Sequence, residues 1–159
     1  MTKNETLTDD SLYLASIYRI HAAIFVESAK LLAERLEVDP VGTPTTLAAI
    51  PVYLLSSHAA ELFLKAALLK RGFGDRDLRE FNYRHNLGAL LDAVQQAGVC
   101  VTAETEEMVR GFSTQHEDHS LRYTALVDDR RPTYMPPVVM VFAMLEELLL
   151  LTRISTQGV

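Results

Sequence analysis

A single cysteine, Cys100, is present in this chain of 159 residues. One thiol excludes an internal disulfide framework and a zinc site built from several cysteines, and it favours a reducing compartment. The first ten residues are polar and acidic, without the basic start and apolar core of a secretory signal. We therefore expect a cytoplasmic protein. No base lies near Cys100 in the sequence, so we expect a small buried residue there and not a nucleophile.

Basic residues are also scarce. The chain has 15 lysines and arginines against 21 aspartates and glutamates, which gives a formal net charge of −6. A broad basic surface that binds nucleic acid through counterion release is therefore not expected, although a local basic patch is compatible with this balance.

Several sequence patterns are missing. No alternating apolar pattern typical of strands, no internal repeat, no glycine-rich phosphate loop and no G-x-S-x-G motif occurs. The most apolar stretch, residues 136–153, contains Glu146 and Glu147 and is shorter than the ~20 apolar residues that a membrane span needs. This stretch predicts a buried helix.

The composition, with 48% hydrophobic and 23% charged residues, is that of a folded globular domain. We expect one domain over residues 1–159, with 1–9 as a flexible N-terminus. Apolar spacing and capping residues predict an all-α, five-helix up-and-down bundle in which the first two helices form a long antiparallel pair. Ile24, Leu31 and His21 fall on the apolar face of the first helix, which predicts that this face is buried and that His21 is a packed histidine. The expected helices cover residues 10–36, 45–70, 85–96, 102–114 and 137–152.

Three ionisable residues follow one line of the second helix. His58, Glu61 and Lys65 share a stripe because a helix turns 100° per residue, and Glu61 and Lys65 have the i,i+4 spacing of an ion pair. The stripe is either a structural ion pair or one face of a site. His85 and Asn86 precede the third helix, where a side-chain acceptor is needed, which predicts a cap more than a ligand.

The segments AAELFLKAALLKRGF (59–73) and HNLGALLDAVQQAG (85–98) are joined by a charged link. Their order resembles the HEPN-like family of small prokaryotic helical domains, in which an E-x-x-x-K helix leads into an H-x-L-x-x-L-L helix. The resemblance implies a HEPN-like bundle and a homodimer, whose interface would come from apolar surface left on the long helices, the last helix above all. It also implies a place in a prokaryotic toxin–antitoxin or phage-defence type system.

Catalytic members of this family are metal-independent ribonucleases that use an arginine and a histidine separated by four to six residues. RGFSTQH, from Arg110 to His116, has this spacing at the end of the fourth helix. The resemblance would make His116 the acid/base, Arg110 the phosphate anchor and Glu61 the residue that orients them, with no metal and no cofactor. Arg79 and His85 have the same spacing, in a link where the family does not place the motif.

A degenerate, non-catalytic relative is the alternative. Gly111 stands where the family has a polar residue, and it is a candidate helix end that would leave His116 in a loop. Such a module would dock a partner protein, for instance a nucleotidyltransferase or a cognate antitoxin, or hold a small nucleotide-like ligand. The catalytic form would instead bind single-stranded RNA.

The segment after the fourth helix offers two weaker patterns. His116 and His119, with Glu117 and Asp118 between them, could ligate a divalent metal, but zinc prefers three or four rigid ligands, so a solvated loop is favoured. The segment also holds side chains suited to cation and stacking contacts with RNA, beside acidic neighbours that indicate a neutralised turn. These side chains are Arg122, Tyr123, Arg130 and Arg131.

Overall fold

The computed structural model describes residues 8–80, 82–117 and 134–153. Over these residues the chain is helical and contains no strand, so the predicted all-α class is confirmed. The elements are α1 (Asp9–Ala33), the 3₁₀ turn η1 (Leu47–Ala49), α2 (Ile50–Leu69), α3 (Asp75–Leu78), α4 (Leu87–Gln96), α5 (Ala103–Glu117) and α6 (Val138–Leu151).

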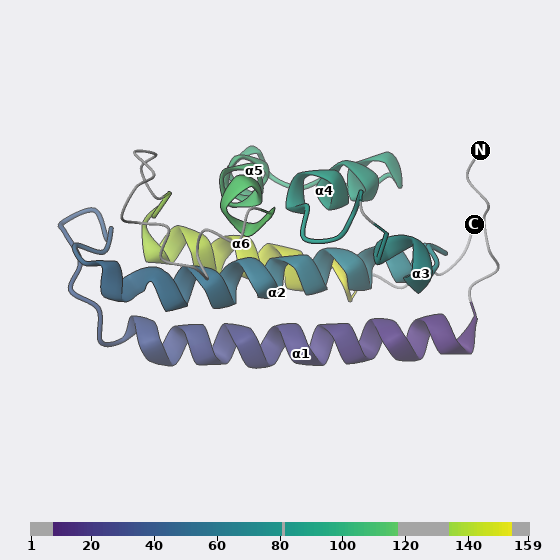
Figure 1. The fold of residues 1–159 in the computed structure, drawn as a ribbon, viewed down its shortest axis with the longest axis horizontal. Coiled ribbons are helices and arrows are strands. Elements are labelled where there is room, and N and C mark those ends of the chain that lie inside the picture. Colours follow the sequence, from purple (N-terminus) through teal and green to yellow (C-terminus); the bar gives the residue numbers. More distant parts are fainter. Residues whose placement is uncertain (1–7, 81, 118–133, 154–159) are drawn as a thin grey trace.

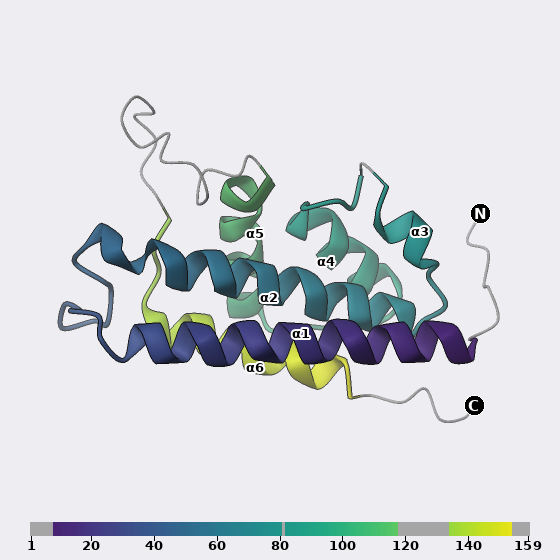
Figure 2. The ribbon, with the colours of Figure 1, turned by 60° about the horizontal axis from the view of Figure 1, so that its bottom comes forward.

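The helices form three layers. α1 and α2 are a long antiparallel pair, α6 lies alongside α2, α4 and α5 cover the face of α2 opposite α1, and α3 lies near the end of α2 (Figure 1). Turning the molecule shows that α5 lies across the long pair (Figure 2). The predicted antiparallel pair is therefore present, whereas the crossing of α5 departs from a simple up-and-down order. The described residues form six α-helices instead of the expected five.

α2 is the central helix because it is apolar on nearly every side. It contacts α1, α4, α5 and α6. Among the described residues, only the helix spanning Leu47–Leu69 has the length and apolar composition to cross a membrane, and 56% of its most apolar window is buried inside the protein. Neighbouring helices cover this surface, as expected for the core helix of a bundle.

The buried positions of α1 are mostly small side chains, whereas its large apolar ones are at most partly buried. The buried residues are Ala15, Ala22, Val26 and Ala29. Small residues let two helix axes approach closely, so this line gives the long pair its contact. Ile24 and Leu31, which the sequence placed on the buried face, are 57% and 65% exposed. His21 is exposed as well, so its prediction as a packed histidine was wrong, because it lies outside the alanine line.

The connections differ from expectation in two places. The charged link after α2 contains α3, a single turn that is fixed to α1 because Tyr18 Oη donates to Asp75 Oδ1 at 2.6 Å. Cys100, in the connection from α4 to α5, is exposed and not buried. The expected flexible N-terminus lies outside the described residues up to position 7, and Thr8 caps α1 by accepting from the Ser11 amide at 3.2 Å.

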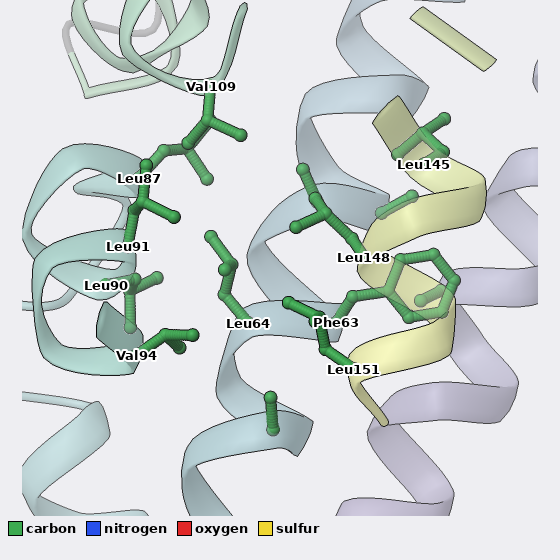
Figure 3. Close-up of a cluster of buried hydrophobic side chains, with 14 of the residues drawn as sticks. Phe63, Leu64, Leu87, Leu90, Leu91, Val94, Val109, Leu145, Leu148 and Leu151 are labelled. Carbon is green, nitrogen blue, oxygen red and sulfur yellow. The ribbon is translucent and has the colours of Figure 1, made fainter. Parts of the chain in front are cut away.

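The core has two compartments, one on each side of α2. Phe63 projects from α2 toward Leu148 and Leu151 of α6, whereas Leu64 projects toward α4 (Figure 3). Leu64 and its neighbours on α4 are fully buried: Leu87, Leu90, Leu91 and Val94. This second compartment sets the position of α4, and therefore that of His85, which lies just before it.

Glu147 of α6 holds the start of α5. Its carboxylate accepts hydrogen bonds from the Thr102 amide and the Thr102 hydroxyl, both at 2.7 Å, and from the Thr105 hydroxyl. Burial by itself raises the pKa of Glu147, but the hydrogen bonds from Thr102 and Thr105 outweigh it and hold the pKa below its ordinary value of 4.5. The ionised carboxylate is therefore the form that joins the two helices.

Glu147→Gln is expected to lower the free energy of unfolding by about 1 kcal/mol at neutral pH, since hydrogen bonds to a charged acceptor are replaced by weaker ones. A carboxyl whose pKa is lower in the folded state stabilises the protein above its unfolded pKa, and this contribution is lost as the pH falls through the folded value. Urea unfolding from pH 7 to pH 3 should therefore show the two proteins converging in acid. Glu146→Gln, at an exposed neighbour, is the control; a difference independent of pH would contradict the assignment.

Candidate functional site

Glu61 is the centre of a cluster of ionisable side chains. Its Oε1 accepts a hydrogen bond from Lys65 Nζ at 2.6 Å, and its Oε2 lies 2.6 Å from His116 Nε2 and 3.1 Å from His85 Nδ1. His58 Nδ1 is 3.8 Å from the same Oε2. The three histidines and Lys65 therefore surround one carboxylate.

The cluster is deeply buried on one side and reaches the surface on the other. Glu61 and His116 are 3% and 2% exposed, and Lys65 is buried beside them. The side chains of His58 and His85 are 30% and 25% exposed. Their rings are nearly parallel, with centroids 6.4 Å apart, and each meets the His116 ring edge-on. His58 and His85 are thus the accessible members, and Glu61 and His116 lie beneath them.

Three segments bring these residues together. His58, Glu61 and Lys65 share one stripe of α2, as the sequence predicts, and His116 comes from the last turn of α5. His85 ends the link before α4 with φ +59°, a left-handed conformation that a non-glycine residue adopts at a cost of about 1–2 kcal/mol. Asn86 is the cap of α4, accepting from the Ala89 amide at 2.8 Å. His85 therefore does not cap the helix but contacts Glu61.

Ser57 fixes the ring of His116. The Ser57 hydroxyl donates to the Leu54 carbonyl at 3.0 Å, so its oxygen accepts the proton of His116 Nδ1 at 3.1 Å. His116 Nε2 then faces an acidic oxygen at 2.6 Å, and two lone pairs would repel each other at that distance. A shared proton therefore lies between them in this geometry. Ser57 is fully buried with its hydroxyl proton engaged, so the order Ser–His–Glu is not a nucleophilic triad.

The electrostatics of the cluster keep Glu61 ionised. Burial by itself raises the pKa of Glu61, but the hydrogen bond with His116 and the positive charge of Lys65 outweigh it and hold the pKa far below its ordinary value. The predicted Glu61–Lys65 ion pair is present and buried. The ion-pair reading of the ionisable stripe is therefore confirmed, and the same carboxylate also belongs to a histidine cluster.

Arg110 does not join this cluster within the single chain. Its guanidinium hydrogen-bonds Asp92 Oδ1 at 2.7 Å and Glu106 Oε1 at 2.9 Å. The side chain is 42% exposed, and these carboxylates raise its pKa by hydrogen bonding. Arg110 precedes His116 by six residues, which is about 240° around a helix, so the two side chains leave α5 on different sides. Of the three residues expected to converge, His116 and Glu61 therefore contact each other, whereas Arg110 lies apart from them.

Arg79 and His85, the other arginine–histidine pair of this spacing, do not come together at the cluster either. Arg79 is ion-paired with Asp75 at 2.7 Å, and its side chain is 65% exposed. His85 alone of that pair reaches Glu61. His119 and the loop side chains Arg122, Tyr123, Arg130 and Arg131 lie outside the described residues.

Gly111 does not end α5, contrary to the expectation for a glycine near a helix end. The helix continues to Glu117, so His116 is placed by a helix and not by a loop. The reason for glycine is packing: an added Cβ at position 111 would lie 2.5 Å from the Tyr134 ring. That ring packs edge-on against Phe112, with centroids 5.5 Å apart. The missing side chain therefore makes room for Tyr134.

Gly111→Ala is expected to lower the free energy of unfolding by about 1 kcal/mol, because an overpacking cost of about 1–3 kcal/mol exceeds the gain of about 1 kcal/mol in helix propensity. Gly88→Ala is the matched control. A Cβ there would make only ordinary contacts, at 3.4 Å or more, so that variant should lose no stability. Thermal unfolding of both proteins is the measurement, and a stabilised Gly111→Ala would show that Tyr134 simply moves aside.

The fold and the cluster define an all-α domain with a buried glutamate ringed by histidines. Among known proteins, no family model, no curated protein and no solved structure matches this chain. The resemblance to HEPN-like domains therefore stands on the sequence segments 59–73 and 85–98 alone.

Sequence reasoning marked every member of the cluster except Ser57, but it joined only His116 to Glu61, through the family resemblance, and left His58 and His85 apart from that pair. His58 was part of the stripe, His85 was a cap and His116 was half of an arginine–histidine pair. One sequence feature could have linked His85 to His116: each histidine follows an arginine at the same spacing, Arg79 before His85 and Arg110 before His116. Both histidines end such a motif, and both contact Glu61.

Proposed function

We propose that this chain is a HEPN-like domain of a prokaryotic toxin–antitoxin or phage-defence type system that cleaves single-stranded RNA without a metal. The observation that carries the proposal is the pair of accessible histidines, His58 and His85, above the buried, ionised Glu61. Two imidazoles at the surface of one cluster are the groups that acid–base cleavage of a phosphodiester requires. Arg110 has no part in this version of the site.

The reaction is an internal transfer that needs no further reactant. The 2′-oxygen of a ribose attacks the adjacent phosphorus while the bond from phosphorus to the 5′-oxygen breaks. His85, whose Nδ1 lies 3.1 Å from Glu61 Oε2, takes the proton of the 2′-hydroxyl. His58 gives a proton to the departing 5′-oxygen. The products are a 2′,3′-cyclic phosphate and a 5′-hydroxyl end.

The buried residues act as positioning residues. Glu61 orients the His85 ring through Nδ1, and Lys65 and His116 hold the carboxylate in turn. Four basic side chains, those of Lys65, His58, His85 and His116, therefore lie around the single carboxylate of Glu61. Such a local group of basic residues favours a phosphate group although the whole chain is acidic.

We also propose that the protein is a homodimer located in the cytoplasm. Large apolar side chains remain exposed on α1 and on α6, the helix that the sequence favours for the interface. On α6 they include Val139 at 71% and Leu150 at 53%. Sedimentation equilibrium of the purified protein is the measurement of this state.

The test of cleavage is an assay of a mixed single-stranded RNA with the full chain in EDTA. His58→Ala and His85→Ala are each expected to reduce the rate by about 10²–10⁴-fold, the usual contribution of a general acid or base. Because both side chains are partly exposed, the melting temperatures should stay close to that of the parent. Arg110→Ala and His21→Ala are the controls and should cleave normally.

Two results would overturn the proposal: cleavage that persists in both histidine variants, or no cleavage above their background. A loss in Arg110→Ala instead would restore the arginine–histidine pair as the catalytic unit. The absence of cleavage would favour the alternative, a non-catalytic module that docks a nucleotidyltransferase-like partner or a cognate antitoxin, or that holds a nucleotide-like ligand.

A further inference from the structure

We infer that His58 Nδ1, Glu61 Oε2 and His116 Nε2 form a binding site for one divalent transition-metal ion of the zinc class. Each of these three residues offers one ligand atom, and the three atoms lie within 4.8 Å of one another. The inference rests on the ligand geometry and does not depend on RNA cleavage. The sequence predicted no metal and considered only His116 with His119, whereas the structure joins His116 to two residues of α2.

The separations suit a tetrahedral ion. Zinc binds histidine nitrogen and carboxylate oxygen at about 2.0–2.2 Å, so two of its ligands stand about 3.4 Å apart. Glu61 Oε2 is 2.6 Å from His116 Nε2 and 3.8 Å from His58 Nδ1, which bracket that value. Metal binding would require side-chain rotations that bring both distances toward that value. Imidazole and carboxylate ligands together favour zinc over calcium or magnesium.

A fourth ligand is close at hand. His85 Nδ1 is 3.1 Å from the same Glu61 oxygen, on the accessible side of the cluster. It can complete a four-coordinate structural site, or it can leave the position to water. Since His85 lies in the link before α4 whereas the other ligands lie on α2 and α5, metal binding would join three segments of the fold.

Neighbouring groups already hold two of the ligands in a suitable form. Ser57 accepts the Nδ1 proton of His116, which leaves the Nε2 lone pair for a cation, and metal-bound histidines commonly have such a partner on the other ring nitrogen. Lys65 occupies only Oε1 of Glu61, so Oε2 faces the histidines. A metal ion would replace the proton that Nε2 and Oε2 share, and the two atoms would move apart to admit it.

Such an ion would also affect the proposed cleavage. It would occupy the ring nitrogen of His58, and that of His85 in the four-coordinate form, so zinc would inhibit the enzyme. This consequence alone rests on the proposed function. Binding and cleavage are therefore measured separately, the first without RNA and the second in EDTA.

The experiment is a titration of the metal-stripped full chain with Co²⁺, followed by absorption spectroscopy, and with Zn²⁺, followed by calorimetry. We expect one ion per chain and the visible absorption of tetrahedral cobalt. His58→Gln and His116→Gln should each weaken binding at least tenfold. His21→Gln, at an exposed histidine of α1, and His119→Gln should bind as tightly as the parent.

His58→Gln is the decisive variant, because its side chain is partly exposed and the protein should fold without it; circular dichroism checks this. Equal affinity of the parent and His58→Gln would overturn the inference, as would the absence of stoichiometric binding. A loss confined to His116→Gln and His119→Gln would overturn it too, because the ligands would then be the sequence pair His116 and His119.

Discussion

Replacing Glu61 with glutamine is expected to lower the free energy of unfolding by about 3–5 kcal/mol in metal-free protein, the usual cost of removing one partner of a buried ion pair. The carboxylate is 3% exposed and is the acceptor for Lys65 and His116, both buried beside it. Glutamine keeps the volume but removes the negative charge, so the positive charge of Lys65 remains in the interior without compensation. The loss is therefore electrostatic and not one of packing.

Urea unfolding in EDTA measures this loss, and two variants make it specific. Glu106→Gln removes a carboxylate that is also hydrogen-bonded, to Arg110 and Gln95, but lies at the surface in water, so it should cost much less stability than Glu61→Gln. Glu61→Leu combined with Lys65→Met removes both charges and should be more stable than Glu61→Gln. If Glu61→Gln unfolds like the parent, the buried ion pair contributes no net stability and the cluster is more hydrated than its burial indicates.

The part of this site that lies on one helix was predictable. His58, Glu61 and Lys65 are close in sequence, and the helix period alone places them on one stripe. The contact of His116 with Glu61 joins residues 55 positions apart, and only the family resemblance suggested it. No local pattern encodes how α5 crosses α2, so the sequence could not show that Arg110 would turn away toward Asp92 and Glu106.

Helix positions were predictable to within a few residues, but their buried faces were less so. For α1 the spacing of large apolar residues selected a face that includes Ile24 and Leu31, whereas the structure buries the alanines. Hydrophobicity scales favour large side chains, but close contact between two long helices favours small ones. Gly111 was misread for a related reason, because its role comes from Tyr134, a residue distant in sequence.

Leu64→Ala is expected to lower the free energy of unfolding by about 2–5 kcal/mol, the range observed for buried leucine truncations that leave a cavity. Leu64 is fully buried and projects from α2 toward α4 (Figure 3). Urea unfolding gives the magnitude. Leu150→Ala is the matched control, since that leucine of α6 is 53% exposed and its truncation should change stability by less than about 0.5 kcal/mol.

The same variant separates the two roles of the histidine cluster. α4 begins at Leu87, directly after His85 and Asn86, so a cavity between α2 and α4 loosens the placement of His85. His58, Glu61 and His116 come from α2 and α5 and keep their positions. Leu64→Ala should therefore lose RNA cleavage more strongly than Zn²⁺ affinity, measured below its unfolding temperature. Equal losses of both would mean that the compartment beside α4 supports the whole cluster and not His85 in particular.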